Sequence, residues 1–81
     1  MKTVNKLLKA ETNKRMGNHS VNFIQSGREF IYHYTAIIVT NDILRTFKVN
    51  RNGWYTQSTT RAINAYKSEL KASGYQLIEE K

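Results

Sequence analysis

The sequence predicts a small α+β fold: a four-stranded antiparallel meander, a C-terminal helix packed on one face of it, and an N-terminal helix. Three observations predict this fold. Turn dipeptides divide the middle of the chain into short runs of β-branched and aromatic residues. Counting outward from these turns places the large apolar side chains on one face of the sheet. A Ser/Thr-rich stretch followed by apolar residues at helical spacing predicts the C-terminal helix.

The turns of the meander, residues 20–57, are predicted at three dipeptides: Ser26-Gly27, Asn41-Asp42 and Asn52-Gly53. Two-residue hairpin turns need residues that tolerate a positive φ, and Asn-Gly is the strongest signal of this kind. Gly53 therefore has a structural role in this prediction. Residues 28–40 contain no such signal and are predicted to form one long strand.

The three turns fix the strand registers, because a two-residue loop determines which residues face each other. The registers pair Phe23 with Phe30, Ala36 with Phe47, and Arg51 with Trp54. Side chains alternate between the two faces of a sheet. One face then carries Val21, Phe23, Phe30, Tyr32, Tyr34, Ala36, Ile38, Ile43, Phe47, Val49 and Trp54. We expect this face to be the core, with Trp54 as the anchor for the C-terminal helix.

The C-terminal helix is predicted over residues 58–74. Ser58, Thr59 or Thr60 could cap its start, because a hydroxyl accepts hydrogen bonds from free backbone N–H groups. Gly74 stands where a left-handed helix end is expected. Residues 75–79 could add a short edge strand.

A basic N-terminal helix is predicted over residues 1–17, with Gly17 ending it. Its apolar positions Val4, Leu7 and Leu8 are expected to cover the second face of the sheet. That face is apolar at Ile37, Val39 and Leu44. If uncovered, these three residues would form a patch suited to a protein partner.

Composition predicts one domain, residues 1–81, without a cofactor. The chain has no cysteine and no proline, which excludes disulfides and favours a reducing cytoplasm. No apolar run has the length of about 20 residues that a membrane span requires. His19 and His33 match no zinc pattern, and no nucleophile or phosphate-loop motif is present. We expect a protein that is not an enzyme and holds no metal.

The charge of the chain favours an anionic partner. Thirteen Lys and Arg residues against six Asp and Glu residues give a net charge of +7. A charge of this size also fits plain solubility. The candidate nucleic-acid-binding residues are Lys6, Lys9, Arg28, Lys48, Asn50, Arg51, Tyr55 and Arg61. The basic residues would contact phosphates, with DNA preferred to RNA because most aromatic residues are expected in the core.

The alternative is an inhibitor that binds a host protein through a sheet edge or the N-terminal helix. The two hypotheses predict different surfaces. A continuous basic stripe favours nucleic acid, whereas basic residues around an apolar groove favour a protein partner.

The segment GWYTQSTTRAINAY, with Gly74-Tyr75 after it, resembles small uncharacterised phage-encoded proteins. These have a Gly-Trp strand followed by a Ser/Thr-capped Arg-Ala-Ile-Asn helix, and the resemblance covers about the last third of the chain. It implies a phage origin and a role in host takeover or anti-defence, such as an anti-CRISPR-like inhibitor, but no site residues. The basic charge differs from that of acidic DNA mimics.

Overall fold

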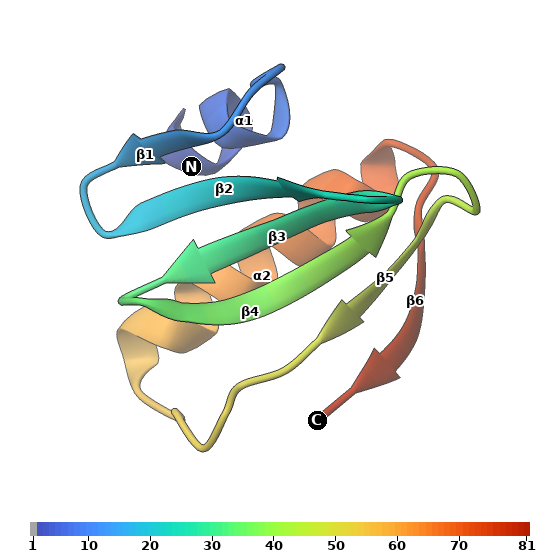
Figure 1. Cartoon of the computed structure of the whole chain (residues 1–81). Helices are drawn as coiled ribbons and strands as arrows, with labels where there is room; N and C mark the ends of the chain where they lie inside the picture. The colour runs from blue at the N-terminus through green and yellow to red at the C-terminus, as the bar shows by residue number, and fades with distance from the viewer. Residues whose placement is uncertain (1) are drawn as a thin grey trace.

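The structure, a computed structural model that describes residues 2–81, is an α+β fold with one six-stranded sheet. The helices are α1 (Lys2–Leu8) and α2 (Gln57–Ala72). The strands, which lie in the sheet in chain order, are β1 (Lys14–Met16), β2 (His19–Ile24), β3 (Gly27–Tyr32), β4 (Thr35–Asn41), β5 (Thr46–Val49) and β6 (Gln76–Glu80) (Figure 1). The predicted fold class is confirmed, and the sheet is larger than the predicted four strands.

The first five strands form an antiparallel meander, whereas β6 is parallel to β5. Parallel neighbours need a crossover connection, and α2 supplies it. The strand predicted at 75–79 is therefore present as β6, at the edge of the sheet.

The predicted long strand over residues 28–40 is wrong, because a turn at His33-Tyr34 divides it into β3 and β4. Both turn residues have a positive φ, 51° for His33 and 66° for Tyr34. Tyr32 faces Thr35 across this two-residue turn. A pair of positive φ values is the geometry of a type I′ turn, whose usual residues are Asn and Gly. The sequence gives no such signal here.

The other registers are also shifted from the predicted ones. Ile24 faces Gly27, so the first turn lies at residues 25–26, one residue earlier than predicted. Asn41 faces Thr46 across a four-residue loop, in which the Asn41 side chain accepts hydrogen bonds from the backbone N–H groups of residues 43 and 44. Ile43 lies in this loop and is exposed, not in the core as predicted.

The turn at Asn52-Gly53 forms, but the strand predicted after it does not. Asn52 and Gly53 have φ values of 52° and 82°, and the N–H of Trp54 donates to the carbonyl of Arg51. The chain then enters α2 three residues after Trp54 without pairing again. Trp54 is consequently 56% exposed and does not act as the predicted core anchor.

Both ends of α2 are capped by side-chain or backbone hydrogen bonds. Thr56, one residue before the helix, accepts from the N–H of Thr59, so the cap lies earlier than predicted. At the other end Gly74 has a φ of 90°, and the N–H of Tyr75 donates to the carbonyl of Leu70. This arrangement is a Schellman ending, as the sequence predicted for Gly74.

The N-terminal segment forms less helix than predicted. The helix α1 ends at Leu8, and residues 14–16 form β1, which pairs with β2 across a turn at Gly17-Asn18. Gly17, with a φ of 63°, supports that turn and does not end the helix. Helical periodicity over seven residues is too short to mark a helix end reliably.

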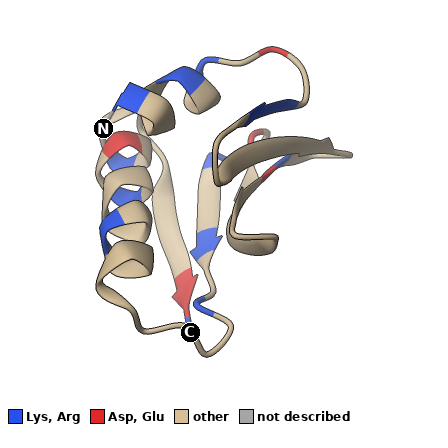
Figure 2. Ribbon diagram, turned by 90° about the vertical axis from the view of Figure 1, so that its left-hand side faces the viewer, with Lys and Arg blue, Asp and Glu red and all other residues tan. Residues whose placement is uncertain are grey.

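Both helices pack on the same face of the sheet, which corrects the prediction that the N-terminal helix covers the second face (Figure 2). Val4 and Leu7 of α1 are fully buried in the same cluster as Ile63 and Tyr66 of α2. The remaining members of this core are Val21, Phe30, Ile37, Ile38, Phe47, Val49, Ala62 and Leu70. A single apolar cluster therefore joins both helices to the sheet.

Within residues 2–81 the opposite face of the sheet is not covered by a helix. By strand alternation it presents Ser20, Asn22, Ile24, Glu29, Ile31, Val39, Lys48 and Glu79, a mixture of polar and apolar side chains. Mixed composition of this kind lets one face of an antiparallel sheet meet water. Ile37 is not on this face: an irregular register between β3 and β4 places both Ile37 and Ile38 in the core.

Candidate nucleic-acid interface

Exposed aromatic side chains gather where the β3–β4 turn approaches the start of α2. Tyr34 is 84% exposed, Tyr55 73% and Trp54 56%. Tyr34 belongs to the β3–β4 turn, whereas the other two lie between β5 and α2. We call this surface the aromatic end. Large aromatic side chains left in water are costly for folding alone, so their grouping indicates a binding surface.

Two arginines lie against these aromatic rings. The guanidinium carbon of Arg15 is 5.2 Å from the ring centre of Tyr34, and its Nη2 donates to the Tyr34 hydroxyl at 3.3 Å. The guanidinium carbon of Arg51 is 5.4 Å from the ring centre of Tyr55, and its Nη1 donates to Thr60 Oγ1 at 2.8 Å. Such cation–π contacts hold the guanidinium group in one orientation, and its positive charge is not neutralised. Arg61, the next residue along α2, is exposed.

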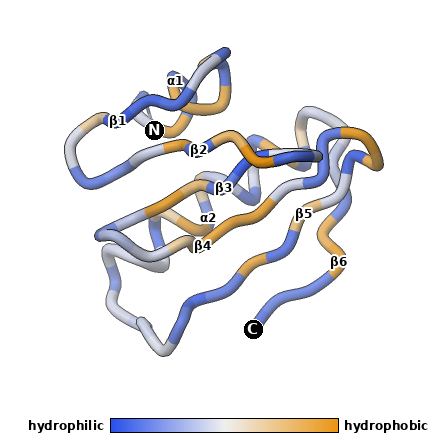
Figure 3. Tube along the Cα trace, in the orientation of Figure 1, coloured by the Kyte–Doolittle hydropathy of each residue, from blue (hydrophilic) through white to orange (hydrophobic). Residues whose placement is uncertain are grey.

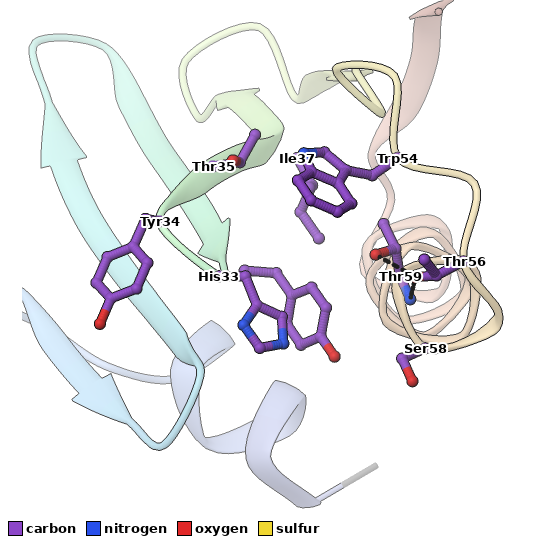
Figure 4. A pocket seen from close by; sticks show the side chains of 9 residues that line it. His33, Tyr34, Thr35, Ile37, Trp54, Thr56, Ser58 and Thr59 are labelled. Atoms are coloured by element: carbon purple, nitrogen blue, oxygen red, sulfur yellow. Dashed lines mark hydrogen bonds between the residues drawn. The ribbon is translucent and has the colours of Figure 1, made fainter.

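A pocket of about 480 Å³ opens at the aromatic end. It is lined by Tyr32, His33, Tyr34, Thr35, Ile37, Trp54, Thr56, Ser58 and Thr59. In Figure 4 Trp54 lies beside Ile37 at one wall, His33 lies across from Ser58, and Tyr34 is turned away from the α2 side. The pocket thus has an aromatic wall and a wall formed by the first turn of α2.

Carboxylates are absent from the segments that build the aromatic end. Residues 12–28, 30–41 and 43–68 contain no Asp or Glu. Glu80 is held by Lys67 at 2.8 Å; this hydrogen bond lowers the pKa of Glu80, and the charge of Arg51 lowers it further. The aromatic end therefore presents arginines with no acidic side chain among the pocket residues.

The structure brings together half of the residues predicted to bind nucleic acid. Asn50, Arg51, Tyr55 and Arg61 lie in one segment between β5 and the first turn of α2. Lys48 lies on the uncovered sheet face, 3.7 Å from Glu79. Lys6 of α1 and Lys9, the residue after that helix, are exposed. The basic residues therefore do not form one continuous stripe, and Lys and Arg are spread over both layers in Figure 2. The feature that the sequence hypothesis required of a phosphate-binding surface is thus not found among residues 2–81.

Lys9 lies far from the aromatic end, because it shares a small depression with Glu69 and Ser73 at the C-terminal end of α2. The aromatic end contains the N-terminal end of the same helix. Lys9 therefore serves below as a control position.

Arg28 is in the core and does not fit the predicted role in phosphate binding. It is 9% exposed, and its guanidinium donates two hydrogen bonds to the Asp42 carboxylate, at 3.0 and 3.1 Å. It also donates to the carbonyl of Leu8 and the hydroxyl of Tyr75. The sequence could not separate this buried arginine from the exposed ones. Arg28 faces Thr40 on the core face of β3. A correctly predicted register would therefore have indicated that Arg28 is buried.

Sequence analysis also missed Arg15, Tyr34 and Trp54 as site residues. Tyr34 and Trp54 were expected in the core, and Arg15 on a helix. The missed turn at His33-Tyr34 and the missing strand after Gly53 account for both aromatic errors. Three long stretches of the sequence contain no acidic residue, and this feature could have indicated that the aromatic end carries no Asp or Glu.

His19 lies next to the aromatic end in a half-buried position. Its Nδ1 is 3.2 Å from the hydroxyl of Tyr66, and its ring centre is 4.8 Å from that of Tyr32. Loss of solvation lowers the pKa of His19, and repulsion from His33 adds to this effect. Burial raises the pKa of Tyr66, so its hydroxyl stays protonated and available as a hydrogen-bond donor.

We expect the free energy of unfolding to fall as the pH drops below about 6.5, the ordinary pKa of histidine. The unfolded chain takes up a proton at His19 before the folded protein does, so acid favours unfolding. Urea unfolding at pH 7.5 and pH 5.0 measures this loss. His19→Phe should flatten the dependence, whereas His33→Gln should keep most of it. Equal pH dependence in the wild type and His19→Phe would contradict this assignment.

Comparisons of the chain with protein-family models, with curated proteins and with solved structures found no match. Within residues 2–81 no group of three or more His, Cys, Asp or Glu side chains could hold a metal ion. Neither helix of this part of the chain is long and apolar enough to cross a membrane.

Proposed function

We propose that the protein is a non-catalytic nucleic-acid-binding protein that uses the aromatic end to bind single strands. The observation that carries this proposal is that the exposed rings of Tyr34, Trp54 and Tyr55 occur with Arg15 and Arg51 beside a pocket that no acidic residue lines. Proteins that bind single strands combine aromatic side chains for base stacking with cations for phosphates. Each stacked base contributes about 1–3 kcal/mol.

Single strands fit this surface better than a duplex does. Bases in a duplex are already stacked on each other, so exposed aromatic side chains gain little from it, whereas unpaired bases can stack on them. The expectation from the sequence was different: basic residues contact phosphates, and most aromatic residues are buried in the core. The sequence favours DNA over RNA, whereas stacking on exposed rings suits unpaired bases of either.

The first test is the salt dependence of binding. We expect a fluorescently labelled 12-nucleotide single strand, DNA or RNA, to bind more tightly than a duplex of the same length in anisotropy titrations. Each neutralised phosphate contributes about 0.7 to the slope of log K against log salt for single strands. The triple variant Arg15→Gln, Arg51→Gln, Arg61→Gln should therefore lower this slope by about 2.

The matched control removes three cations elsewhere: Lys9→Gln, Arg45→Gln and Lys71→Gln. Arg45 lies in the β4–β5 loop, and Lys71 near the C-terminal end of α2, so these changes alter net charge equally without touching the aromatic end. The control variant should change the slope of log K against log salt by less than half of the change in the Arg15, Arg51, Arg61 variant. Absence of binding to every nucleic acid at low salt would overturn the proposal. Equal effects of both variants would place binding elsewhere.

The uncovered sheet face supports a second candidate, a protein-binding inhibitor. A groove of about 380 Å³ on this side is lined partly by Ile24, Val39, Leu44 and Ile78. Ile24 is 40% exposed, Leu44 70% and Ile78 53%. The apolar β4–β5 loop at the end of this groove is orange in Figure 3. If the protein binds no nucleic acid, this groove becomes the main candidate surface for binding a partner protein. Ile78→Glu should then abolish binding of that partner protein.

Other expectations from the sequence stay predictions. They are the lack of enzymatic activity, the cytoplasmic location, and the phage origin with a host-takeover or anti-defence role. A phage accessory protein of either kind is compatible with both surfaces.

A further inference from the structure

We infer that the pocket beside Trp54 receives one unstacked nucleobase of the bound strand. This inference rests on the proposed function and adds to it a place where base identity is read. The remaining bases would stack on the exposed rings outside the pocket, where every base offers a similar face.

The shape and walls of the pocket suit a flat aromatic ligand. Its volume of about 480 Å³ is within the range of roughly 300–1,000 Å³ that is usual for small-ligand sites. Trp54 and Ile37 form an apolar wall, with Trp54 still 56% exposed and able to stack (Figure 4). A nucleobase can place one face against the indole while its edge points toward the opposite wall.

Three polar side chains of the pocket are free to bind that edge. Within residues 2–81 no hydrogen bond engages the side chains of His33, Thr35 or Ser58. By contrast, the hydroxyls of Thr56 and Thr59 are bonded to each other at 2.9 Å and cap α2. A hydroxyl both donates and accepts, so Thr35 and Ser58 can match the donors and acceptors of a base edge.

The charges around the pocket identify the ligand as a nucleotide strand and not an uncharged apolar molecule. Arg15 is fixed at the β3–β4 turn through Tyr34, and Arg51 is fixed beside Tyr55 on the other side, before α2. Neither arginine lines the pocket, so we expect both to contact phosphates of the strand outside it. No pocket residue is acidic, so nothing in the lining repels a phosphate.

The test uses Trp54, which is the single tryptophan of the chain and reports on the pocket through its own fluorescence. Two 12-nucleotide DNA strands are compared, one of thymidines and one with the same phosphates but abasic sugars. The thymidine strand should quench Trp54 fluorescence and bind more tightly by at least about 5- to 150-fold, the range for one stacked base, because the abasic strand also loses the bases stacked outside the pocket. The abasic strand should bind through its phosphates without quenching.

A pair of variants localises the effect. Ser58→Leu fills the pocket at the start of α2, and Ser68→Leu makes the same change at an exposed position near the other end of that helix. We expect Ser58→Leu to remove most of the Trp54 quenching and to lower the affinity for the thymidine strand at least tenfold. The affinity of Ser68→Leu should stay within twofold of that of the wild type. Circular dichroism of both variants checks that they fold.

The outcomes separate this inference from the proposed function. Equal effects of the two leucine variants would overturn the base pocket and leave binding at the aromatic end intact. Equal quenching and affinity for both strands would overturn base stacking altogether, in the pocket and on the exposed rings, and leave only phosphate binding. Failure of both strands to bind at low salt would overturn the proposed function and the pocket with it.

Discussion

Gly27→Ala is expected to unfold the protein or to cost more than about 3 kcal/mol of stability, because a Cβ at this position would overlap the carbonyl group of Thr40. Gly27 is buried at the start of β3 and faces Asn41 of β4. The obstacle is backbone, so no side-chain rotation relieves it. The two strands would have to separate where the meander makes many of its contacts. Urea unfolding followed by circular dichroism measures the loss.

Gly53→Ala is the matched control for this substitution. Nothing lies within 4 Å of a Cβ at Gly53, and the only penalty is its φ of 82°. That strain costs about 1–2 kcal/mol. A loss at Gly27 no larger than the loss at Gly53 would show that β3 and β4 can move apart at little cost.

Arg28→Met is expected to destabilise the protein by about 2–4 kcal/mol. The substitution leaves the Asp42 carboxylate, the Tyr75 hydroxyl and the Leu8 carbonyl without their shared donor. Removing one partner of a fully buried ion pair costs about 3–5 kcal/mol. The Asp42 side chain keeps 33% of its exposure, so the cost should be somewhat lower. Thermal and urea unfolding measure it.

The pH dependence gives an independent check on this network. Burial alone would raise the pKa of Asp42, but hydrogen bonds from Arg28 and Tyr75, together with the charge of Arg28, lower it. The stabilisation is therefore present above the ordinary aspartate pKa of about 3.9 and is lost as the pH falls below it. Arg28→Met should weaken this loss in acid.

Lys48→Met provides the control, because it breaks an exposed ion pair instead of a buried one. The Nζ of Lys48 is 3.7 Å from Glu79, and the two side chains are 56% and 39% exposed. Exposed pairs contribute little to stability, because water and salt screen the two charges. If Arg28→Met costs no more than Lys48→Met, the Arg28 network does not stabilise the fold.

The sequence predicts the elements of this protein better than it predicts their registers. The cap glycine Gly74 and the turn at Asn52-Gly53 were found because both need a positive φ that glycine adopts easily. The turn at His33-Tyr34 was missed because two bulky residues adopt the same φ there. Tertiary pairing of β3 with β4 compensates for this local strain, and single-sequence patterns do not record such compensation.

The site was predicted less well than the fold, for a related reason. A register error reverses or shifts the surroundings of each side chain, so Arg28 was taken as exposed and Tyr34 as buried. Arg51, Tyr55 and Arg61 were identified because they are close in sequence. Arg15 lies far from them along the chain and joins the surface only through the pairing of β1 with β2.

The pairing of β6 with β5 also influences the order in which the chain can fold. The strands from β1 to β5 pair with neighbours that are close in sequence, whereas β6 must return across α2 before it reaches β5. Pairings between distant segments form later than local hairpins. During synthesis, a chain whose β6 is still inside the ribosome therefore presents β5 as an open edge. Once β6 has paired, it becomes the edge strand itself, and its adjacent Glu79 and Glu80 place negative charge there, which opposes pairing with other chains.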